Sequence, residues 1–272
     1  MTNSLQSNGK PRTSPLFDAH LHVIDPRFPL TPNQGYLPQP FTVADYLAIA
    51  RPLGVLGGAL VAGSFQGFDQ DYLRDALARL GPGFVGVAQI PLDTPVAELR
   101  RLDALGVRAL RFNLRRGMHS DLGAMQALAQ RAHAEVGWHC ELYLDAAAVP
   151  DLGPWLAGLP SLCIDHLGLT RAGLPHLLRL LEAGVWVKAT GFARLDFPPA
   201  EALAVVCRAS PGRVVFGTDL PGTRAPRPFD PEDLSLIAAT LADAELREAV
   251  LYLNALTLYR LPLPNSEAQP SP

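Results

Sequence analysis

Short apolar runs rich in β-branched residues alternate along the chain with longer Ala- and Leu-rich stretches of helical periodicity. The short runs are typical of buried strands, and the longer stretches are typical of amphipathic helices. The predicted strands are 16–24, 57–63, 84–90, 109–114, 139–145, 162–168, 185–191 and 214–220. The predicted helices are 42–53, 70–80, 95–105, 122–136, 147–158, 173–183, 199–209 and one long helix over about 231–260.

Eight strands, each followed by a helix, predict a single α/β domain built as a (β/α)8 TIM-type barrel. The same alternation allows a doubly wound open sheet, but that fold would be expected to have a glycine-rich phosphate turn after its first strand. This chain has histidines there instead. We therefore expect one barrel over 15–261, with disordered tails at 1–14 and 262–272, which are polar or rich in proline and serine.

Composition narrows the class of protein and its partners. The 272 residues suit one barrel, because such domains typically contain about 250 residues. A formal net charge of −3 gives no reason to expect nucleic acid or a membrane surface as a partner. No apolar signal core or membrane-spanning stretch is present, and Cys140, Cys163 and Cys207 form no CxxC pair. We therefore expect a cytoplasmic protein in a reducing compartment; the sequence allows a homo-oligomer.

The most informative segment is the first predicted strand, which carries His20 and His22. Residues i and i+2 of a strand point to the same face, so both imidazoles are expected side by side. A lone histidine in an apolar strand is more often a core residue, but a pair at a strand end favours function. His166 and Asp219 also end apolar runs. A carboxylate there is costly to bury unless it is paired or liganded, although an aspartate can also cap a helix.

If the barrel is right, functional side chains lie where the carboxyl ends of the strands meet. Polar residues gather at those predicted ends: His20, His22, Ser64, Arg111, Arg115, Arg116, Tyr143, His166, Arg194 and Asp219. Strand alternation places Arg111 on one face with Ala109 and Asn113, so that Arg111 can point into the mouth. For Arg115 and Arg116, in the loop beyond, a solvated surface role is the alternative. Other histidines, His139 among them, are expected to have a structural role or to lie on the surface.

Three imidazoles and one carboxylate, from His20, His22, His166 and Asp219, suit a divalent transition metal such as Zn²⁺. Such an ion would lower the pKa of a bound water to about 7. The same residues could also work without a metal, with Asp219 as the general base and the imidazoles and arginines stabilising an oxyanion. The sequence leaves both states open: no cofactor, or one divalent metal.

These motifs together resemble the amidohydrolase superfamily, in its amidohydrolase-2 branch. Phe17-Asp18-Ala19-His20-Leu21-His22 is similar to the strand-one D-x-H-x-H of that family, and Ile164-Asp165-His166-Leu167-Gly168 is similar to its strand-six histidine motif. Phe216-Gly217-Thr218-Asp219 resembles the strand-eight G-T-D, and Asn254-Ala255-Leu256-Thr257-Leu258-Tyr259 resembles the closing N-P-x-x-L-Y helix. The matches span nearly the whole chain in the expected order.

Finer features resemble the 2-pyrone-4,6-dicarboxylate lactonase group of that superfamily. They are the segment Ser64–Asp69, Arg111-Phe112-Asn113, and Gly137-Trp138-His139 with Tyr143. The sequence departs from the family after Asp219, where Leu220-Pro221-Gly222 replaces the usual W-P-H, and at Ala255, which replaces proline. Glu141 would also place a carboxylate inside the barrel. The departures bear on the substrate more than on the reaction class.

The resemblance implies a hydrolase that opens a carboxylate-bearing lactone by attack of water, for which a metal can be dispensable. Asp219 would activate the water, and His20, His22 and His166 would polarise the carbonyl, directly or through a metal. Arg111, Arg115 or Arg116, and Arg194 would hold the carboxylates of a small anionic substrate, with Ser64 and Tyr143 adding hydrogen bonds. The alternatives are a metal-dependent decarboxylase on the same scaffold and a non-catalytic ligand-binding barrel.

Overall fold

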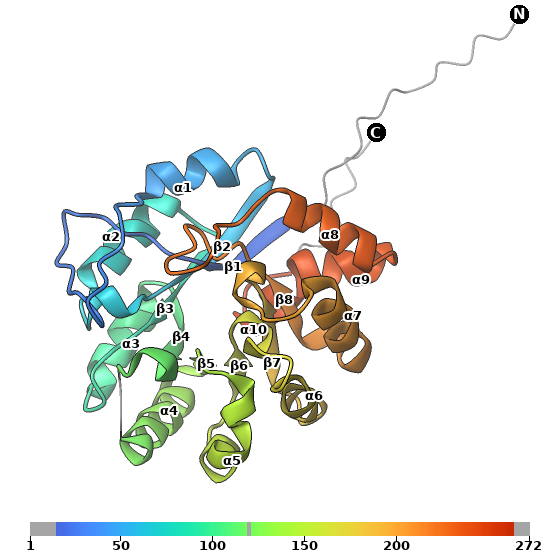
Figure 1. Ribbon diagram of the computed structural model, residues 1–272. Coiled ribbons are helices and arrows are strands. Elements are labelled where there is room, and N and C mark those ends of the chain that lie inside the picture. The colour runs from blue at the N-terminus through green and yellow to red at the C-terminus, as the bar shows by residue number, and fades with distance from the viewer. Residues whose placement is uncertain (1–14, 119–120, 264–272) are drawn as a thin grey trace, which may run out of the picture.

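The computed structural model describes residues 15–118 and 121–263. Eight strands form one sheet in which each strand pairs in parallel with the next along the chain. Parallel neighbours need crossover connections, and these place the helices outside the sheet (Figure 1). The predicted (β/α)8 barrel is confirmed. The strands are β1 (Leu16–Leu21), β2 (Val55–Val61), β3 (Phe84–Ala88), β4 (Val107–Phe112), β5 (His139–Leu142), β6 (Leu162–Ile164), β7 (Trp186–Ala189) and β8 (Val214–Phe216).

Helices surround the strands in chain order, and the last helix lies over the middle of the barrel (Figure 1). They are α1 (Val43–Ala50), α2 (Asp71–Leu80), α3 (Val96–Ala104), α4 (Leu122–Val136), α5 (Val149–Ala157), α6 (Leu174–Glu182), α7 (Pro199–Ala209), α8 (Glu232–Thr240), α9 (Ala244–Glu248) and α10 (Asn254–Leu258). The prediction of one long helix over 231–260 is wrong. The Asp243 side chain accepts hydrogen bonds from the backbone N–H groups of Glu245 and Leu246, so it begins a new helix after a break. A π-helical turn over 249–253 then joins α9 to α10.

Several predicted strands end earlier than expected, because one-turn 3₁₀ helices follow them. These turns are η1 (Ser64–Gln66) after β2, η2 (Leu114–Arg116) after β4, η4 (His166–Gly168) after β6 and η5 (Phe192–Arg194) after β7. Each of these turns carries a residue that the sequence singled out. Short turns after the strands therefore carry half of the predicted site residues.

The strands bury one face against the helices and the other inside the barrel. On β4, Leu110 and Phe112 join the core beneath the helices, whereas Ala109 belongs to the cluster inside the barrel. Arg111 shares the inward face, as predicted, and is buried. Helix α10 and the residue after it close one end of the barrel, since Ala255 and Tyr259 belong to the inner cluster.

The barrel closes between β1 and β8 without a full ladder. The backbone N–H of Asp219 donates to the carbonyl of His20 (2.7 Å), and that of His22 donates to the carbonyl of Leu220 (2.8 Å). Asp18 reinforces the seam, because its carboxylate accepts hydrogen bonds from the N–H and hydroxyl of Thr218 at 2.7 and 2.6 Å. The hydrogen bonds that close the barrel thus also fix three of the polar residues at its mouth.

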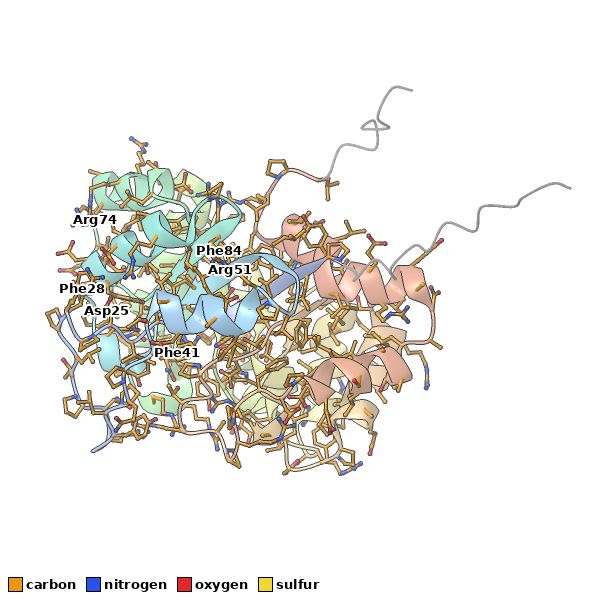
Figure 2. The ribbon with its side chains drawn as sticks, turned by 90° about the horizontal axis from the view of Figure 1, so that it is seen from above. Asp25, Phe28, Phe41, Arg51, Arg74 and Phe84 are labelled. Atoms are coloured by element: carbon orange, nitrogen blue, oxygen red, sulfur yellow. The ribbon has the colours of Figure 1, made fainter. Side chains whose placement is uncertain are left out.

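A long segment follows β1 and is fixed at its base. Ile24 and Phe41 exchange two backbone hydrogen bonds of 2.7 and 2.8 Å. Inside the loop, buried Asp25 accepts hydrogen bonds from the guanidinium of Arg27 at 2.7 to 3.1 Å. Figure 2 shows Asp25, Phe28 and Phe41 on the same side of the molecule. The segment between Ile24 and Phe41 is therefore an ordered loop with joined ends.

The cysteines, the absence of a membrane span and the tails were also predicted from the sequence. Cys140, Cys163 and Cys207 are all free and buried, as expected of small apolar side chains. Across the described residues, no helix combines the length and apolarity needed to cross a membrane. The predicted tails, 1–14 and most of 262–272, lie outside the described residues.

Candidate active site

All ten predicted residues lie at the carboxyl ends of the strands, and the side chains of nine of them gather at the mouth of the barrel. They are His20 on β1, His22 and Tyr143 just past β1 and β5, Ser64 on η1, Arg111 on β4, Arg116 on η2, His166 on η4, Arg194 on η5 and Asp219 past β8. Arg115 is the exception. Its side chain is 45% exposed and lies 4.0 Å from Asp145 Oδ2, away from the others.

A cavity opens at this end of the barrel. Most of the predicted residues line it, and the long loop after β1 adds Tyr36 to its wall. The segment after β8 adds Thr223 and Arg224. His20 and Asp219 lie one layer beneath the wall, since Asp219 Oδ1 is 3.8 Å from Nε2 of the wall residue His22.

The two histidines of the first strand stand edge to face, with ring centroids 5.0 Å apart. A shift in the β1–β2 register between Asp18 and Leu21 accounts for their direction. Before the shift, Ala19 faces the barrel interior, and after it Leu21 faces the helices. One irregular step in β1 therefore turns both imidazoles inward.

Both imidazoles are held in the neutral state. Burial lowers the pKa of His22 to about 3, and the charge of Arg111 acts in the same direction. Burial also places the pKa of His20 well below the ordinary range, again with a contribution from nearby cations. His22 Nδ1 lies 2.7 Å from the carbonyl oxygen of Val61, which can only accept. Nδ1 therefore carries the proton, and Nε2 of His22 presents a lone pair.

The two carboxylate oxygens of Asp219 have different surroundings. Oδ2 accepts a 2.6 Å hydrogen bond from Nε of Arg194. Oδ1 is buried without a hydrogen bond from any described residue, and it lies 3.9 and 3.8 Å from Nε2 of His20 and His22. Burial raises the pKa of Asp219 even though Arg194 and Arg111 oppose the shift. A buried carboxylate oxygen with a raised pKa and no donor is suited to accept a proton.

Asp165, whose role was not predicted, lies between His20 and Arg111 and contacts both. Its Oδ2 is 3.2 Å from Nη2 of Arg111, and its Oδ1 is 3.4 Å from Nδ1 of His20. Arg111 also donates from Nη1 to Nε2 of His20 over 3.3 Å. Like Asp219, Asp165 directly follows an apolar run, so the sequence contained a signal that could have identified it.

Two of the site residues adopt a backbone conformation that is uncommon outside glycine. The φ angles of His166 and Asp219 are 50° and 62°. Such conformations cost on the order of 1–3 kcal/mol and cluster at functional sites. His166 is further fixed by a 2.8 Å hydrogen bond between Nδ1 and the Thr190 hydroxyl.

Gly191 is a functional position that sequence reasoning missed. It has a φ of 56°, and a Cβ there would lie 2.8 Å from His166 Nδ1 and 2.9 Å from Asp219 Oδ2. The absence of a side chain therefore lets the two groups approach each other. Nothing in the local pattern of the sequence marks this glycine among the 23 in the chain.

The donor atoms fall into two overlapping groups. Those of His20, His22 and Asp219 lie within 4.8 Å of one another, as do those of His20, Asp165 and His166. The four predicted ligands thus do not form one set. The first group suits a divalent cation, because Asp219 Oδ1 is orphaned and His22 Nε2 is a free lone pair. Arg111 occupies the lone pair of His20, so an ion would have to displace that contact.

The chain was compared with known proteins. The family model described as Amidohydrolase matches residues 17–261. The chain is 30% identical to a 4-sulfomuconolactone hydrolase from Rhizobium radiobacter, and the match covers 89% of each chain. It is 28% identical to a 2-pyrone-4,6-dicarboxylate hydrolase from Comamonas testosteroni, again over 89% of each. A D-galactarolactone isomerase from Agrobacterium fabrum is 26% identical over 90% of each chain.

Proposed function

The chain belongs to the amidohydrolase family, and we propose that it hydrolyses a small lactone bearing acidic groups. The observation that carries the proposal is Asp219 Oδ1, a buried oxygen without a hydrogen bond from the described residues, next to a cavity lined by several guanidiniums. Two of the relatives are named as hydrolases of lactones that bear carboxylate or sulfonate groups. An oxygen suited to accept a proton and a cationic cavity are the two features that such a reaction needs.

In the proposed reaction, Asp219 Oδ1 takes a proton from water as the water oxygen attacks the lactone carbonyl carbon. The lone pair of His22 Nε2 accepts the second hydrogen of that water and so fixes its orientation. When the tetrahedral intermediate collapses, the ring C–O bond breaks, and the proton held by Asp219 passes to the departing ring oxygen. The products are a carboxylic acid and a hydroxyl group on one open chain.

The cations of the site supply the electrostatic part of catalysis. Arg111 lies on the cavity wall, and in the proposal it stabilises the negative charge that develops on the carbonyl oxygen. Arg194 fixes Asp219 through Oδ2, so that Oδ1 stays directed at the water. The hydroxyl groups of Ser64 and Tyr143, also on the wall, add hydrogen bonds to the substrate.

A divalent metal such as Zn²⁺ would be held by His20, His22 and Asp219. When bound, it would act as a Lewis acid toward the carbonyl and lower the pKa of water. The residue roles above do not depend on it, because Asp219 Oδ1 and His22 Nε2 can orient and deprotonate water without an ion. The proposal therefore covers both states, and chelation distinguishes them.

The test is an acid-release assay with purified protein on 2-pyrone-4,6-dicarboxylate and 4-sulfomuconolactone, with and without a chelator. We expect acid release on at least one of them, and release slower by on the order of 10²–10⁴ with Asp219→Asn. Activity that survives chelation supports catalysis by the protein residues alone, and activity lost on chelation and restored by Zn²⁺ supports the metal. Product analysis by NMR separates hydrolysis from ring isomerisation. A rearranged lactone without acid release, or no reaction on any acidic lactone, would overturn the proposal.

A further inference from the structure

Four guanidiniums line the cavity, and they differ in how their charge is balanced. Arg111 is paired with Asp165, and Arg194 is paired with Asp219. Arg116 and Arg224 have no carboxylate within ion-pair distance among the described residues. The wall therefore carries two positive charges that the described part of the protein does not neutralise.

Arg224 is held in place by neutral groups of the loop after β1. Its Nη2 donates to the backbone carbonyl of Asn33, and its Nη1 donates to the Gln34 side chain over 3.3 Å. Its guanidinium carbon lies 4.5 Å from the centre of the Tyr36 ring. These contacts use part of its donor capacity, and none of them provides a carboxylate to balance its charge. Arg224 is thus positioned in advance and can still bind an anion.

Arg116 reaches the same part of the wall from the turn after β4. Its guanidinium carbon lies 5.8 Å from the centre of the Tyr143 ring. Asn33 bridges the two arginines, since its Nδ2 donates to the carbonyl of Arg116 over 3.3 Å while its own carbonyl accepts from Arg224. Burial and the neighbouring charge of Arg116 both lower the pKa of Arg224. The two charges therefore interact, and an anion between them would relieve the repulsion.

We propose that Arg224, together with Arg116, forms an outer anion subsite that selects lactones carrying an acidic group away from the reacting carbonyl. The inference rests on the proposed function and assigns its substrate specificity to a residue of the segment after β8. A carboxylate or a sulfonate would fit, because both present oxygens to the guanidinium donors. Arg111 and Arg194 are already engaged by Asp165 and Asp219, so the protein leaves the outer pair to recognise this group.

The test measures binding and does not require turnover. Benzene-1,3-dicarboxylate and its neutral diamide have nearly the same shape and differ in charge. Dissociation constants for both are measured by calorimetry with the wild-type protein, Arg224→Ala and Arg224→Lys. Arg179→Ala, which removes an exposed charge from α6, is the matched control. Circular dichroism establishes that each variant is folded.

We expect the wild-type protein to prefer the dicarboxylate over the diamide. Arg224→Ala should reduce that preference about tenfold or more, since hydrogen bonds to charged groups are the strong ones. Arg224→Lys should retain most of it, and Arg179→Ala should leave it unchanged. An equal loss for both ligands would mean that Arg224 only holds the loop, and it would overturn the proposal. An unchanged preference in Arg224→Ala, or none in the wild-type protein, would overturn it as well.

The proposed hydrolysis can fail separately from this subsite. A protein that binds the dicarboxylate through Arg224 but releases no acid from any lactone would keep the subsite and lose the reaction. A protein that hydrolyses lactones without regard to Arg224 would keep the reaction and lose the subsite.

Discussion

Two polar layers lie inside the barrel, and they satisfy their hydrogen bonds in opposite ways. The lower layer consists of His139, Glu141, Lys188 and Tyr259, and the upper layer consists of His20, Arg111, Asp165 and Asp219. Both are buried. In the lower layer, Glu141 accepts hydrogen bonds from Lys188, His139 (3.3 Å) and Tyr259 (2.7 Å). Lys188 also donates to the Ala19 carbonyl over 2.8 Å.

In the upper layer, every member has at least one buried side-chain atom without a hydrogen bond from the described residues. Asp165 lacks a hydrogen bond at both oxygens, Asp219 lacks one at Oδ1, and His20 and Arg111 each leave one nitrogen unsatisfied among the described groups. Buried polar groups are nearly always hydrogen-bonded, so such exceptions need an explanation. We propose that function explains them, because Arg111 lines the cavity and Asp219 Oδ1 lies 3.8 Å from the wall residue His22. An unsatisfied atom in this place can bind water or substrate.

Because both layers are buried and charged, burial of charge does not by itself identify an active site. The layers are in contact, since Lys188 Nζ lies 3.9 Å from Asp165 Oδ1. In our proposal, the same kinds of side chain stabilise the fold in the lower layer and provide reactive groups in the upper layer. Substitutions in the upper layer should therefore lower activity, and substitutions in the lower layer should lower stability.

The largest expected effect is on activity in the upper layer. Asp219→Asn should lower kcat on a hydrolysed lactone by on the order of 10²–10⁴, the usual contribution of a general base. The melting temperature should change little, because the amide oxygen can still accept from Arg194. Steady-state kinetics and thermal unfolding check both parts. Wild-type turnover in this variant would remove Asp219 from the mechanism.

The second effect is on stability in the lower layer. Glu141→Gln leaves the buried Lys188 charge without its closest carboxylate and should reduce the free energy of unfolding by about 3–5 kcal/mol. Although burial opposes it, attraction to Lys188 keeps the pKa of Glu141 below its ordinary value, which indicates that Glu141 is ionised. Urea denaturation measures the loss.

The matched control for the lower layer removes both charges. Glu141→Gln combined with Lys188→Met should recover most of the lost stability, since replacing both partners of a buried pair is often nearly neutral. If Glu141→Gln alone costs less than about 1 kcal/mol, the value of a surface pair, the lower layer is not the stabilising element that we describe.

The third effect separates geometry from chemistry in the upper layer. Gly191→Ala removes no polar group, but its Cβ would press on His166 and Asp219. We expect kcat/KM to fall about a hundredfold, because small displacements of reacting groups are costly. Gly212→Ala is the control, since a Cβ there meets no atom within 4 Å. Equal activity in the two variants would show that the site tolerates the displacement.

The smallest effect concerns pH and the seam between β1 and β8. Burial raises the pKa of Asp18 to about 6, from 3.8 in the unfolded chain. A raised pKa stabilises the fold below pH 3.8, and that contribution is lost as the pH rises through 6. The stability of Asp18→Asn relative to the wild-type protein should therefore increase by on the order of 2 kcal/mol between pH 3.5 and 7. Denaturation of both proteins across that range checks the sign, and a difference independent of pH would contradict it.

The sequence determined the architecture because the signals for it are local. Apolar runs and helical periodicity predicted eight βα units. In any such barrel the carboxyl ends of all eight strands lie at the same end. His20, His22, His166 and Asp219 could therefore be grouped from their places at strand ends. Their roles as ligands or bases stay predictions.

Only the tertiary structure determined the register of β1 and the ion pairs between distant segments. The shifted register of β1 sends the histidine pair inward, whereas regular alternation cannot tell which face of a strand is inside. The pairing of Glu141 with Lys188 and of Arg111 with Asp165 joins strands far apart in the chain. Of the four arginines on the cavity wall, Arg111 and Arg194 have a carboxylate partner among the described residues, whereas Arg116 and Arg224 have none there. The local sequence pattern shows where charged residues lie along the chain. Which of them form ion pairs depends on contacts between distant segments, and those contacts exist only in the closed barrel.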